Sequence, residues 1–265
     1  MRRAISNAMT SVPASVLQYL VIVGLIIWAA MNGAAQMGYN WQWYRIPQYF
    51  YEITDEGFVW GEISRGLVAT LMLSGTAFAL AVVIGLTVAL LRLSGLITGR
   101  WVSVIFLELI RNTPLLVLLY LFYYVLGPIF KLDRTTASVL CLGVFHGALI
   151  SEIFRAGINA VATGQWEAAA SIGMTRTQSY RYIILPQSIK LMLPPMTGEA
   201  VNVIKSSAIV SVIAVVELTT IGRNIISDTY MSFEIWFTIA LVYLVITLAL
   251  SIFVSRLEAR YSIAT

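Results

Sequence analysis

The residues Glu167-Ala168-Ala169-Ala170-Ser171-Ile172-Gly173 are followed in the same polar segment by Ile183-Ile184-Leu185-Pro186. Together they form the pattern E-A-A-x3-G-x9-I-x-L-P, between the fourth and fifth apolar stretches of the chain. The whole chain is 59% hydrophobic and only 11% charged, whereas soluble domains contain about 25% charged residues. The composition therefore indicates a membrane protein, in which this pattern marks a polar loop.

Six apolar stretches approach the roughly 20 residues that a helix needs to cross the hydrocarbon layer. They cover about residues 15–31, 66–91, 102–130, 135–154, 193–216 and 233–254. A membrane helix satisfies its own backbone hydrogen bonds, and the alternating pattern of barrel strands is absent. The sequence therefore predicts an all-α membrane protein with about six transmembrane helices. The first stretch also allows a signal peptide, which we disfavour because no small-residue cleavage site is clear.

The distribution of positive charge predicts the orientation of these spans. With the N-terminus inside, five of the 17 arginines and lysines fall outside, at Arg45, Arg65, Lys131, Arg134 and Arg223. Lys205 falls within a span, and all the others, including Arg2 and Arg3, fall in inner segments. The positive-inside rule therefore favours N-in and C-in and assigns the loop around Glu167 to the cytoplasm. The excess of basic over acidic residues is explained by this topology. The sequence has no stripe of basic residues interleaved with aromatics, so nucleic-acid binding is a poor alternative.

The loop pattern resembles the EAA loop of the membrane subunits of binding-protein-dependent ABC importers. Residues 108–116 (ELIRNTPLL) and 205–213 (KSSAIVSVI), the latter followed by Glu217-Leu218, resemble stretches of the polar amino acid subfamily. The similarity extends over about residues 66–260. It implies a five-helix permease core at residues 63–260 with a cytoplasmic coupling loop at 160–190. Residues 1–62 would then be an added N-terminal helix and outer aromatic loop.

The resemblance also implies the function and the partners. The chain would form the path for glutamate, aspartate, glutamine or a basic amino acid across the bacterial inner membrane. It would pair with an identical or homologous permease, two copies of an ABC ATPase, and a periplasmic or lipid-anchored substrate-binding protein. The sequence lacks the G-x-x-x-x-G-K-[ST] phosphate loop, so ATP and Mg²⁺ are expected in the partner ATPase. We expect no catalytic residue, cofactor or metal in this chain.

The coupling loop must pass a movement from the ATPase to the membrane, and a short helix seated in a groove can do so. The alanines favour helix, Gly173 allows a close turn, and Pro186 disfavours helix just before it. Glu167 could accept hydrogen bonds from the partner or cap the helix. The coupling residues predicted from the family are Glu167, Ala168, Ala169, Gly173, Ile183, Leu185 and Pro186. An ordinary pair of amphipathic helices at the membrane face is the alternative.

Charged residues within the fifth stretch suggest a substrate path, because such groups are costly in hydrocarbon unless they face a polar cavity or each other. The predicted path residues are Glu199, Asn202, Lys205, Ser206 and Ser207. Glu199 and Asn202 share a helical face, whereas Lys205 would lie off it. Glu199 would attract the substrate ammonium and Lys205 a carboxylate. A polar pair that only holds helices together is equally compatible with the sequence.

Two features of the sequence concern helix geometry, one in the fifth stretch and one in the third. The prolines at 194 and 195 and Gly198 precede Glu199, which suggests a broken or kinked helix lining a cavity. Residues 111–114, which end in Pro114, suggest a further kink at the cytoplasmic entry of the third span.

Other residues receive structural interpretations. His146 is predicted to be a hydrogen-bonded histidine that packs between helices, and a proton relay is the less favoured alternative. Gly143 and Gly147 suggest a small-residue face for another helix. The aromatic and acidic segment at residues 39–62 is predicted to be a short helix or loop on the outer surface, either an interfacial anchor or a docking surface.

Two other functions remain compatible with the composition. An ion- or proton-coupled secondary carrier would transport without an ATPase, but such carriers are usually longer and contain inverted repeats. A membrane subunit without transport activity would tolerate changes at Glu199 and Lys205.

Overall fold

The computed structural model describes residues 12–55 and 57–261 of the chain, so Arg2 and Arg3 lie outside the described residues. The chain divides into two compact units, residues 1–43 and 44–265. The first unit contains helix α2 (Val12–Gln36), whose described side chains are mostly exposed. Its residues Ser15–Gln36 are long and apolar enough to cross a membrane. The Trp41 and Trp43 rings that follow are stacked with their centroids 6.2 Å apart.

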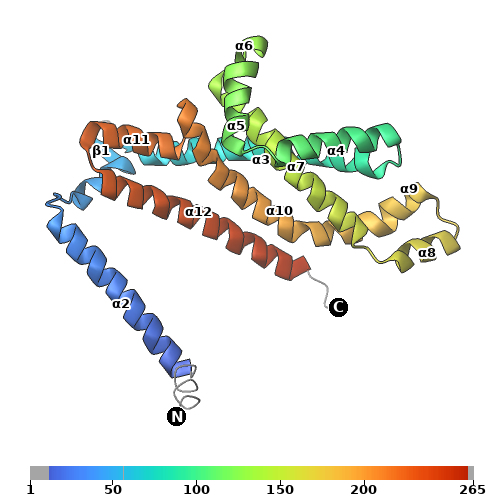
Figure 1. The fold of residues 1–265 in the computed structure, drawn as a ribbon, viewed down its shortest axis with the longest axis horizontal. Helices are drawn as coiled ribbons and strands as arrows, with labels where there is room; N and C mark the ends of the chain where they lie inside the picture. The colour runs from blue at the N-terminus through green and yellow to red at the C-terminus, as the bar shows by residue number, and fades with distance from the viewer. Residues whose placement is uncertain (1–11, 56, 262–265) are drawn as a thin grey trace. The chain divides into compact units, whose positions relative to one another are not determined.

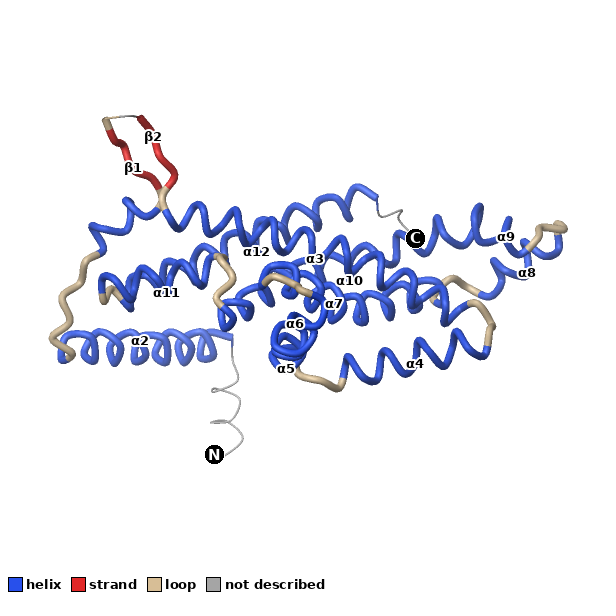
Figure 2. Tube along the Cα trace, turned by 90° about the horizontal axis from the view of Figure 1, so that it is seen from above, coloured by secondary structure: helices blue, strands red, loops and turns tan. Residues whose placement is uncertain are grey.

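The segment before the second membrane helix is more ordered than the predicted helix or loop. A 3-10 helix covers Trp43–Tyr49, and the strands β1 (Tyr51–Thr54) and β2 (Gly57–Trp60) pair as an antiparallel hairpin. The sequence signal for this hairpin was its β-branched and aromatic content on either side of Asp55-Glu56-Gly57. Figure 2 shows the hairpin projecting away from the helices just before α3 begins.

Helix α3 (Glu62–Leu93) is followed by α4 (Ile97–Arg111), and then the chain turns sharply. Helix α5 (Leu115–Tyr120), a π-helical turn (Leu121–Leu126) and α6 (Gly127–Phe130) form an arm at 103° to α4. Figure 1 shows this arm rising steeply from the region where α3 and α7 lie. The kink predicted at Pro114 is confirmed, and it divides the span predicted at 102–130 into two helical pieces. Pro114 has no N–H to donate and disfavours helix at the residue before it.

Helix α7 (Arg134–Asn159) leads into the polar loop. The loop contains α8 (Thr163–Ser171), the short α9 (Arg176–Ser179) and a π-helical turn (Tyr180–Ile184). Helix α10 (Leu185–Ser207) then runs into a 3-10 helix (Ala208–Ile213). The chain ends with α11 (Leu218–Thr229) and α12 (Ser232–Tyr261).

The break expected in the fifth span near the prolines is not where the sequence predicted it. Helix α10 continues through Pro194 and Pro195, as membrane helices tolerate when neighbouring groups compensate for the lost donors. The break comes after the 3-10 helix, where Ala214 has a left-handed φ of 56°. Helix α11 departs there at 46°.

Helices α3 and α7 form the tightest pair in the second unit. The two helices run in the same direction, as three successive contacts show: Leu80 faces Gly143, Ile84 faces Gly147, and Gly85 faces Ile150. The predicted small-residue face at Gly143 and Gly147 is thereby confirmed. Within the described residues, four helices are long and apolar enough to cross a membrane, or up to six if each bent pair is one span. This agrees with the predicted all-α membrane fold.

Candidate functional site

The polar loop folds as a helix, a tight turn and a second short helix. Helix α8 ends before Gly173, whose φ of 78° lies in the left-handed region that glycine adopts without strain. Thr175 and Gln178 then form a reciprocal capping box that starts α9. The Thr175 N–H donates to Gln178 Oε1 at 2.8 Å. The glycine at this position is therefore explained by the turn itself.

The inner face of the loop packs against the ends of α7 and α10. Ala169 is completely buried. The Trp166 and Tyr180 rings meet edge to face, with centroids 4.9 Å apart. Both rings pack on a cluster of buried side chains that combines the end of α7 with the start of α10: Ile158, Val161, Ile184 and Met192. The loop is thus continuous with both helices through a common core.

The outer face of the loop is open. Glu167, Ala168, Gly173, Leu185 and Pro186 are exposed, and Ile183 is half-buried. Glu167 lies within α8, whose N-cap is Ala162, so the suggested capping role of Glu167 is wrong. Its backbone carbonyl accepts a hydrogen bond from the Ser171 hydroxyl, at 2.8 Å.

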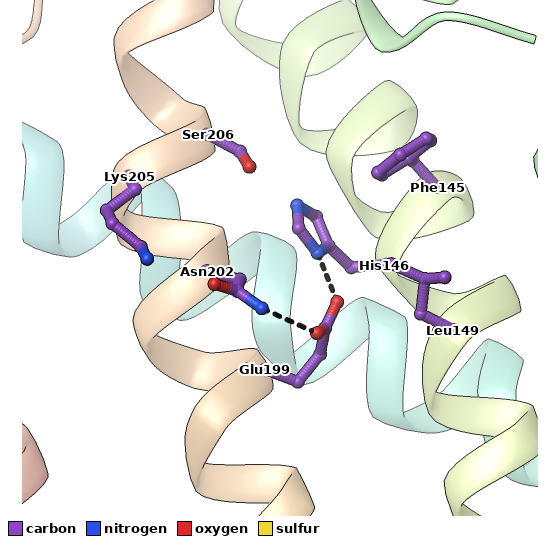
Figure 3. Close-up of a pocket in the computed structure, with 7 residues that line it drawn as sticks. All are labelled: Phe145, His146, Leu149, Glu199, Asn202, Lys205 and Ser206. Atoms are coloured by element: carbon purple, nitrogen blue, oxygen red, sulfur yellow. Dashed lines mark hydrogen bonds and ion pairs between the residues drawn. The ribbon is translucent and has the colours of Figure 1, made fainter. Parts of the chain in front are cut away.

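A second feature is an open polar cavity of about 420 Å³ between α7 and α10, in which Asn202 and Lys205 are exposed. Figure 3 shows Phe145, His146 and Leu149 on α7 facing the side chains of α10. Helix α10 contributes Glu199, Asn202, Lys205 and Ser206 to the lining. Four of the five residues predicted for the path therefore line one cavity.

The carboxylate of Glu199 is held from both sides. His146 Nδ1 lies 2.6 Å from Glu199 Oε1, and Asn202 Nδ2 donates to Glu199 Oε2 at 3.1 Å. His146 and Glu199 are only 1% and 6% exposed, so this pair links the two helices in a largely dry environment. His146 Nε2 is buried and has no hydrogen-bond partner among the described residues.

Lys205 lines the same cavity as Glu199, contrary to the prediction that it would lie off that face. Side chains on a helix point back toward its N-terminus, and the long Lys205 chain turns toward Asn202 (Figure 3). Among the residues that the structure describes, no carboxylate forms an ion pair with Lys205. A Glu199–Lys205 pair is therefore not observed, whereas the His146–Glu199 pair does join two helices, as the alternative of a structural polar pair expects.

Ser207 does not line the cavity. It is completely buried, and its hydroxyl donates to the Ile204 carbonyl at 2.7 Å. The sequence did not predict the three lining residues on α7, which are Phe145, His146 and Leu149. The prediction that this histidine is hydrogen-bonded is confirmed, but its partner was not foreseen.

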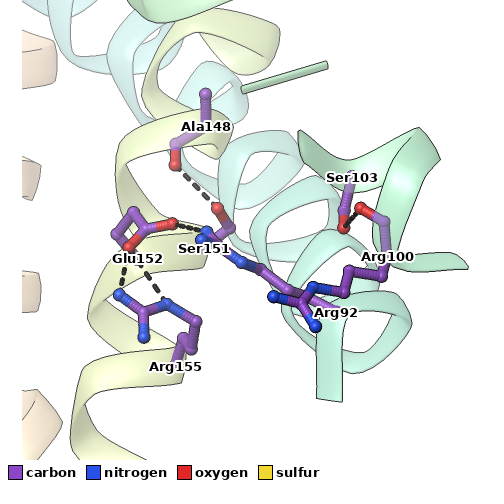
Figure 4. A network of polar contacts seen from close by, with 7 residues as sticks. All are labelled: Arg92, Arg100, Ser103, Ala148, Ser151, Glu152 and Arg155. Atoms are coloured by element: carbon purple, nitrogen blue, oxygen red, sulfur yellow. Dashed lines mark hydrogen bonds and ion pairs between the residues drawn. The ribbon is translucent and has the colours of Figure 1, made fainter. Parts of the chain in front are cut away.

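An ion-pair network lies near the loop end of α3 and α7 (Figure 4). Glu152 on α7 pairs with Arg92 on α3 and with Arg155, whose Nη2 lies 2.7 Å from Glu152 Oε2. The three side chains are between a quarter and a third exposed. The network therefore joins the two helices at the end where α7 enters the loop.

Metal chemistry finds no support in the residues that the structure describes. No group of three or more histidines, cysteines, aspartates or glutamates is arranged to hold an ion. The single Cys141 is a buried free thiol.

The chain resembles known membrane transport proteins over most of its length. Residues 81–263 match the model of the binding-protein-dependent transport system inner membrane component family. A probable glutamine ABC transporter permease protein of Bacillus subtilis is 38% identical over 74% of this chain and 91% of its own length. The glutamate/aspartate import permease protein of Escherichia coli is 31% identical over 84% of this chain and 96% of its own.

Solved structures show the same arrangement. The crystal structure of an amino acid ABC transporter with histidines matches with a TM-score of 0.71 and 42% identity. That match covers 75% of this chain and 93% of the other. The MetNI methionine ABC transporter in an inward-facing conformation matches with a TM-score of 0.65 over 76% of this chain and 97% of the other. At 19% identity, this second match shows a shared fold alone.

Proposed function

Since the chain belongs to the family of binding-protein-dependent transport system inner membrane components, we propose that it forms the membrane path of an ATP-driven importer for a polar amino acid. As a family member it is a multi-pass permease subunit of the bacterial inner membrane. It is not an enzyme, because ATP hydrolysis belongs to a separate subunit of such transporters. The observation that carries the proposal is the polar cavity between α7 and α10.

The cavity suits a small zwitterion. Its volume of about 420 Å³ lies within the range of about 300–1,000 Å³ that small-molecule sites occupy. Glu199 offers a carboxylate to the α-ammonium group, and Lys205 offers an ammonium to the α-carboxylate. The relatives named for glutamine and for glutamate/aspartate support the polar amino acid class.

The coupling loop is positioned to move both walls of this cavity. Helix α10 begins beside the loop and carries Glu199, Asn202 and Lys205 farther along the same continuous helix. The distance from Leu185 to Glu199 along the helix is about 20 Å, at about 1.5 Å per residue. Helix α7, which carries His146, ends at the loop. A displacement of α8 would therefore be transmitted to the cavity through α7 and α10.

The assembly that we propose has two permease chains, identical or homologous, and two ATPase subunits that hold ATP and Mg²⁺. The exposed face of α8 docks on the ATPase, and a substrate-binding protein delivers the amino acid from outside. With N-in and C-in, the loop faces the cytoplasm, as the charge distribution favours. ATP binding closes the ATPases and opens the path outward, and hydrolysis resets it.

Changing Gly173 tests the role of the loop. We expect Gly173→Arg to lower ATPase docking and ATP-driven uptake at least tenfold, because it strains a turn at φ 78° and adds a bulky charge. Gly173→Asn is the control, since asparagine tolerates left-handed geometry and should retain most activity. Docking is measured by co-purification in mild detergent with mass spectrometry, and uptake in proteoliposomes. Normal docking and uptake by the arginine variant would contradict the proposed role of the loop.

The same purification tests the function as a whole. A stoichiometric ATPase partner and uptake that requires ATP are the expected results. A chain that is purified alone and takes up amino acids in response to an ion gradient would instead indicate a secondary carrier.

A further inference from the structure

The charges around the cavity between α7 and α10 are balanced. Glu199 supplies one negative group and Lys205 one positive group. Asn202, Ser206, Phe145 and Leu149 carry no charge. The only other titratable side chain in the lining is His146, and it is already bonded to Glu199.

The two ring nitrogens of His146 differ in their hydrogen bonding. A carboxylate only accepts hydrogen bonds, so Nδ1 carries the proton that it shares with Glu199 Oε1 at 2.6 Å. Nε2 is buried and has no partner among the described residues. The groups of opposite charge that the cavity offers to a ligand are Glu199 and Lys205.

His146 also determines where the Glu199 carboxylate points. The ring comes from α7 and the carboxylate from α10, so their bond fixes the carboxylate from across the cavity (Figure 3). Asn202 fixes the other oxygen from the same helix. Without the bond to His146, the carboxylate would be free to approach Lys205, which lines the same cavity. That approach would neutralise the two groups that a zwitterion requires.

We infer that His146 is a positioning residue that makes this cavity selective for amino acids whose side chain carries no net charge. The inference rests on the proposed function, in which the cavity lies on the substrate path. The α-ammonium binds Glu199, the α-carboxylate binds Lys205, and Asn202 and Ser206 meet a neutral polar side chain. An acidic side chain would find no second cation in the lining, and a basic one no second carboxylate. A charged side chain of the ligand would therefore remain without a counter-charge in the lining, and unpaired charges within membrane segments are costly.

Direct binding to the permease–ATPase complex in nanodiscs, without the binding protein, tests the selectivity. The dissociation constants of L-glutamine, L-glutamate and L-arginine are measured by calorimetry. We expect L-glutamine to bind at least tenfold more tightly than the two charged amino acids. Equal or tighter binding of L-glutamate or L-arginine would overturn the inference.

Two substitutions of His146 test its role. His146→Ala removes the donor to Glu199 and should weaken L-glutamine binding about tenfold. His146→Asn can donate from Nδ2, which occupies nearly the same place as the histidine Nδ1, and should remain within about threefold of the wild type. Equal losses in both variants, at unchanged melting temperature, would show that the donor is not what matters.

A third substitution tests the charge balance itself. Asn202→Asp adds a second carboxylate to the lining, and we expect the preference to shift at least tenfold toward L-arginine. No shift would contradict selection by charge. If the wild-type complex binds none of the three amino acids yet performs ATP-driven uptake with its binding protein, this inference fails and the proposed function stands. Absence of ATP-driven uptake would refute the proposed function instead.

Discussion

The two sides of α7 differ in how closely they approach their neighbours. Toward α3, Gly143 and Gly147 let the helices touch, and a Cβ added at Gly147 would lie 2.8 Å from Ile84 Cγ2. Toward α10, His146 and Leu149 border a polar cavity of about 420 Å³. Around His146, α7 thus has a close-packed face toward α3 and a hollow, hydrogen-bonded face toward α10. Closer to the loop α7 and α10 also meet tightly, since a Cβ added at Gly157 would clash with Met192 Cγ.

This difference suggests that one interface of α7 is rigid and that the other can rearrange. Close-packed interfaces transmit force and do not deform continuously, so we expect α3 and α7 to move as one body. The α7–α10 interface near the cavity depends on a few polar contacts and can rearrange at lower cost. The movable boundary of the path would therefore lie between α7 and α10.

The largest expected effect comes from filling the close-packed face. A Cβ added at Gly85 would lie 2.6 Å from Ile150 Cγ2 and 3.0 Å from the Gly147 carbonyl oxygen. We expect Gly85→Ala to destabilise the protein by about 2 kcal/mol, since overpacking forces backbone shifts. Gly75→Ala, on the same helix with nothing within 4 Å, should instead stabilise it slightly through helix propensity.

The free energy of unfolding, measured by titration with SDS in mixed micelles, checks this pair of variants. Opposite signs for the two alanines would sharpen the comparison between the two sides of α7. Equal effects would mean that α3 and α7 are not tightly packed in the membrane.

A smaller effect on stability is expected from the ion pair between α3 and α7, which lies near the loop end of the two helices. Glu152 joins Arg92 of α3 to Arg155 of its own helix. Partly exposed pairs of this kind contribute about 1 kcal/mol. A double-mutant cycle of Arg92→Met with Glu152→Gln should therefore give a coupling energy of about 1 kcal/mol in the same SDS titration. Arg100 lies near the network in Figure 4 but forms no ion pair with Glu152. Arg100→Met with Glu152→Gln should therefore be additive.

The membrane helices and the loop were predictable from sequence because their signals are local. Apolar length identifies α3, α7 and α12, and the glycine spacing identifies the packing face at Gly143 and Gly147. The turn at Gly173 follows from the one residue type that adopts its φ freely. Features of this kind depend on neighbours along the chain.

The partner of Glu199 was not predictable in the same way. Glu199 and His146 are 53 residues apart, and no spacing within one helix relates them. The available signal was physical: two ionisable groups within membrane spans are costly unless they pair. Applied strictly, that rule would have pointed to His146 as well as to Lys205. The continuity of α10 through Pro194 and Pro195 likewise depends on tertiary surroundings that local rules omit.

The smallest effect on stability is expected at the start of α7, because this first turn belongs neither to the face toward α3 nor to the face toward α10. Asp133 caps this helix, and its carboxylate accepts from the N–H groups of Thr135 and Thr136. Hydrogen bonds from the Thr136 hydroxyl, and then from the backbone, lower the pKa of Asp133 from its usual value of 3.8. Asp133→Ala should cost about 0.5–1 kcal/mol at pH 7, whereas Asp133→Ser keeps an acceptor and should cost less.

The pH dependence of this effect follows from the sign of the shift. A lowered pKa means that the ionised cap stabilises the folded protein above the unfolded-state pKa, and that this contribution is lost as pH falls through the folded-state pKa. The advantage of the wild type over Asp133→Ser should therefore shrink between pH 7 and about pH 3, and solvent exposure keeps it small. SDS titrations at both pH values measure the difference. Because the cap touches neither Gly147 nor Glu199, L-glutamine binding should not change, and a large loss of binding would show that the two sides of α7 are not independent of its first turn.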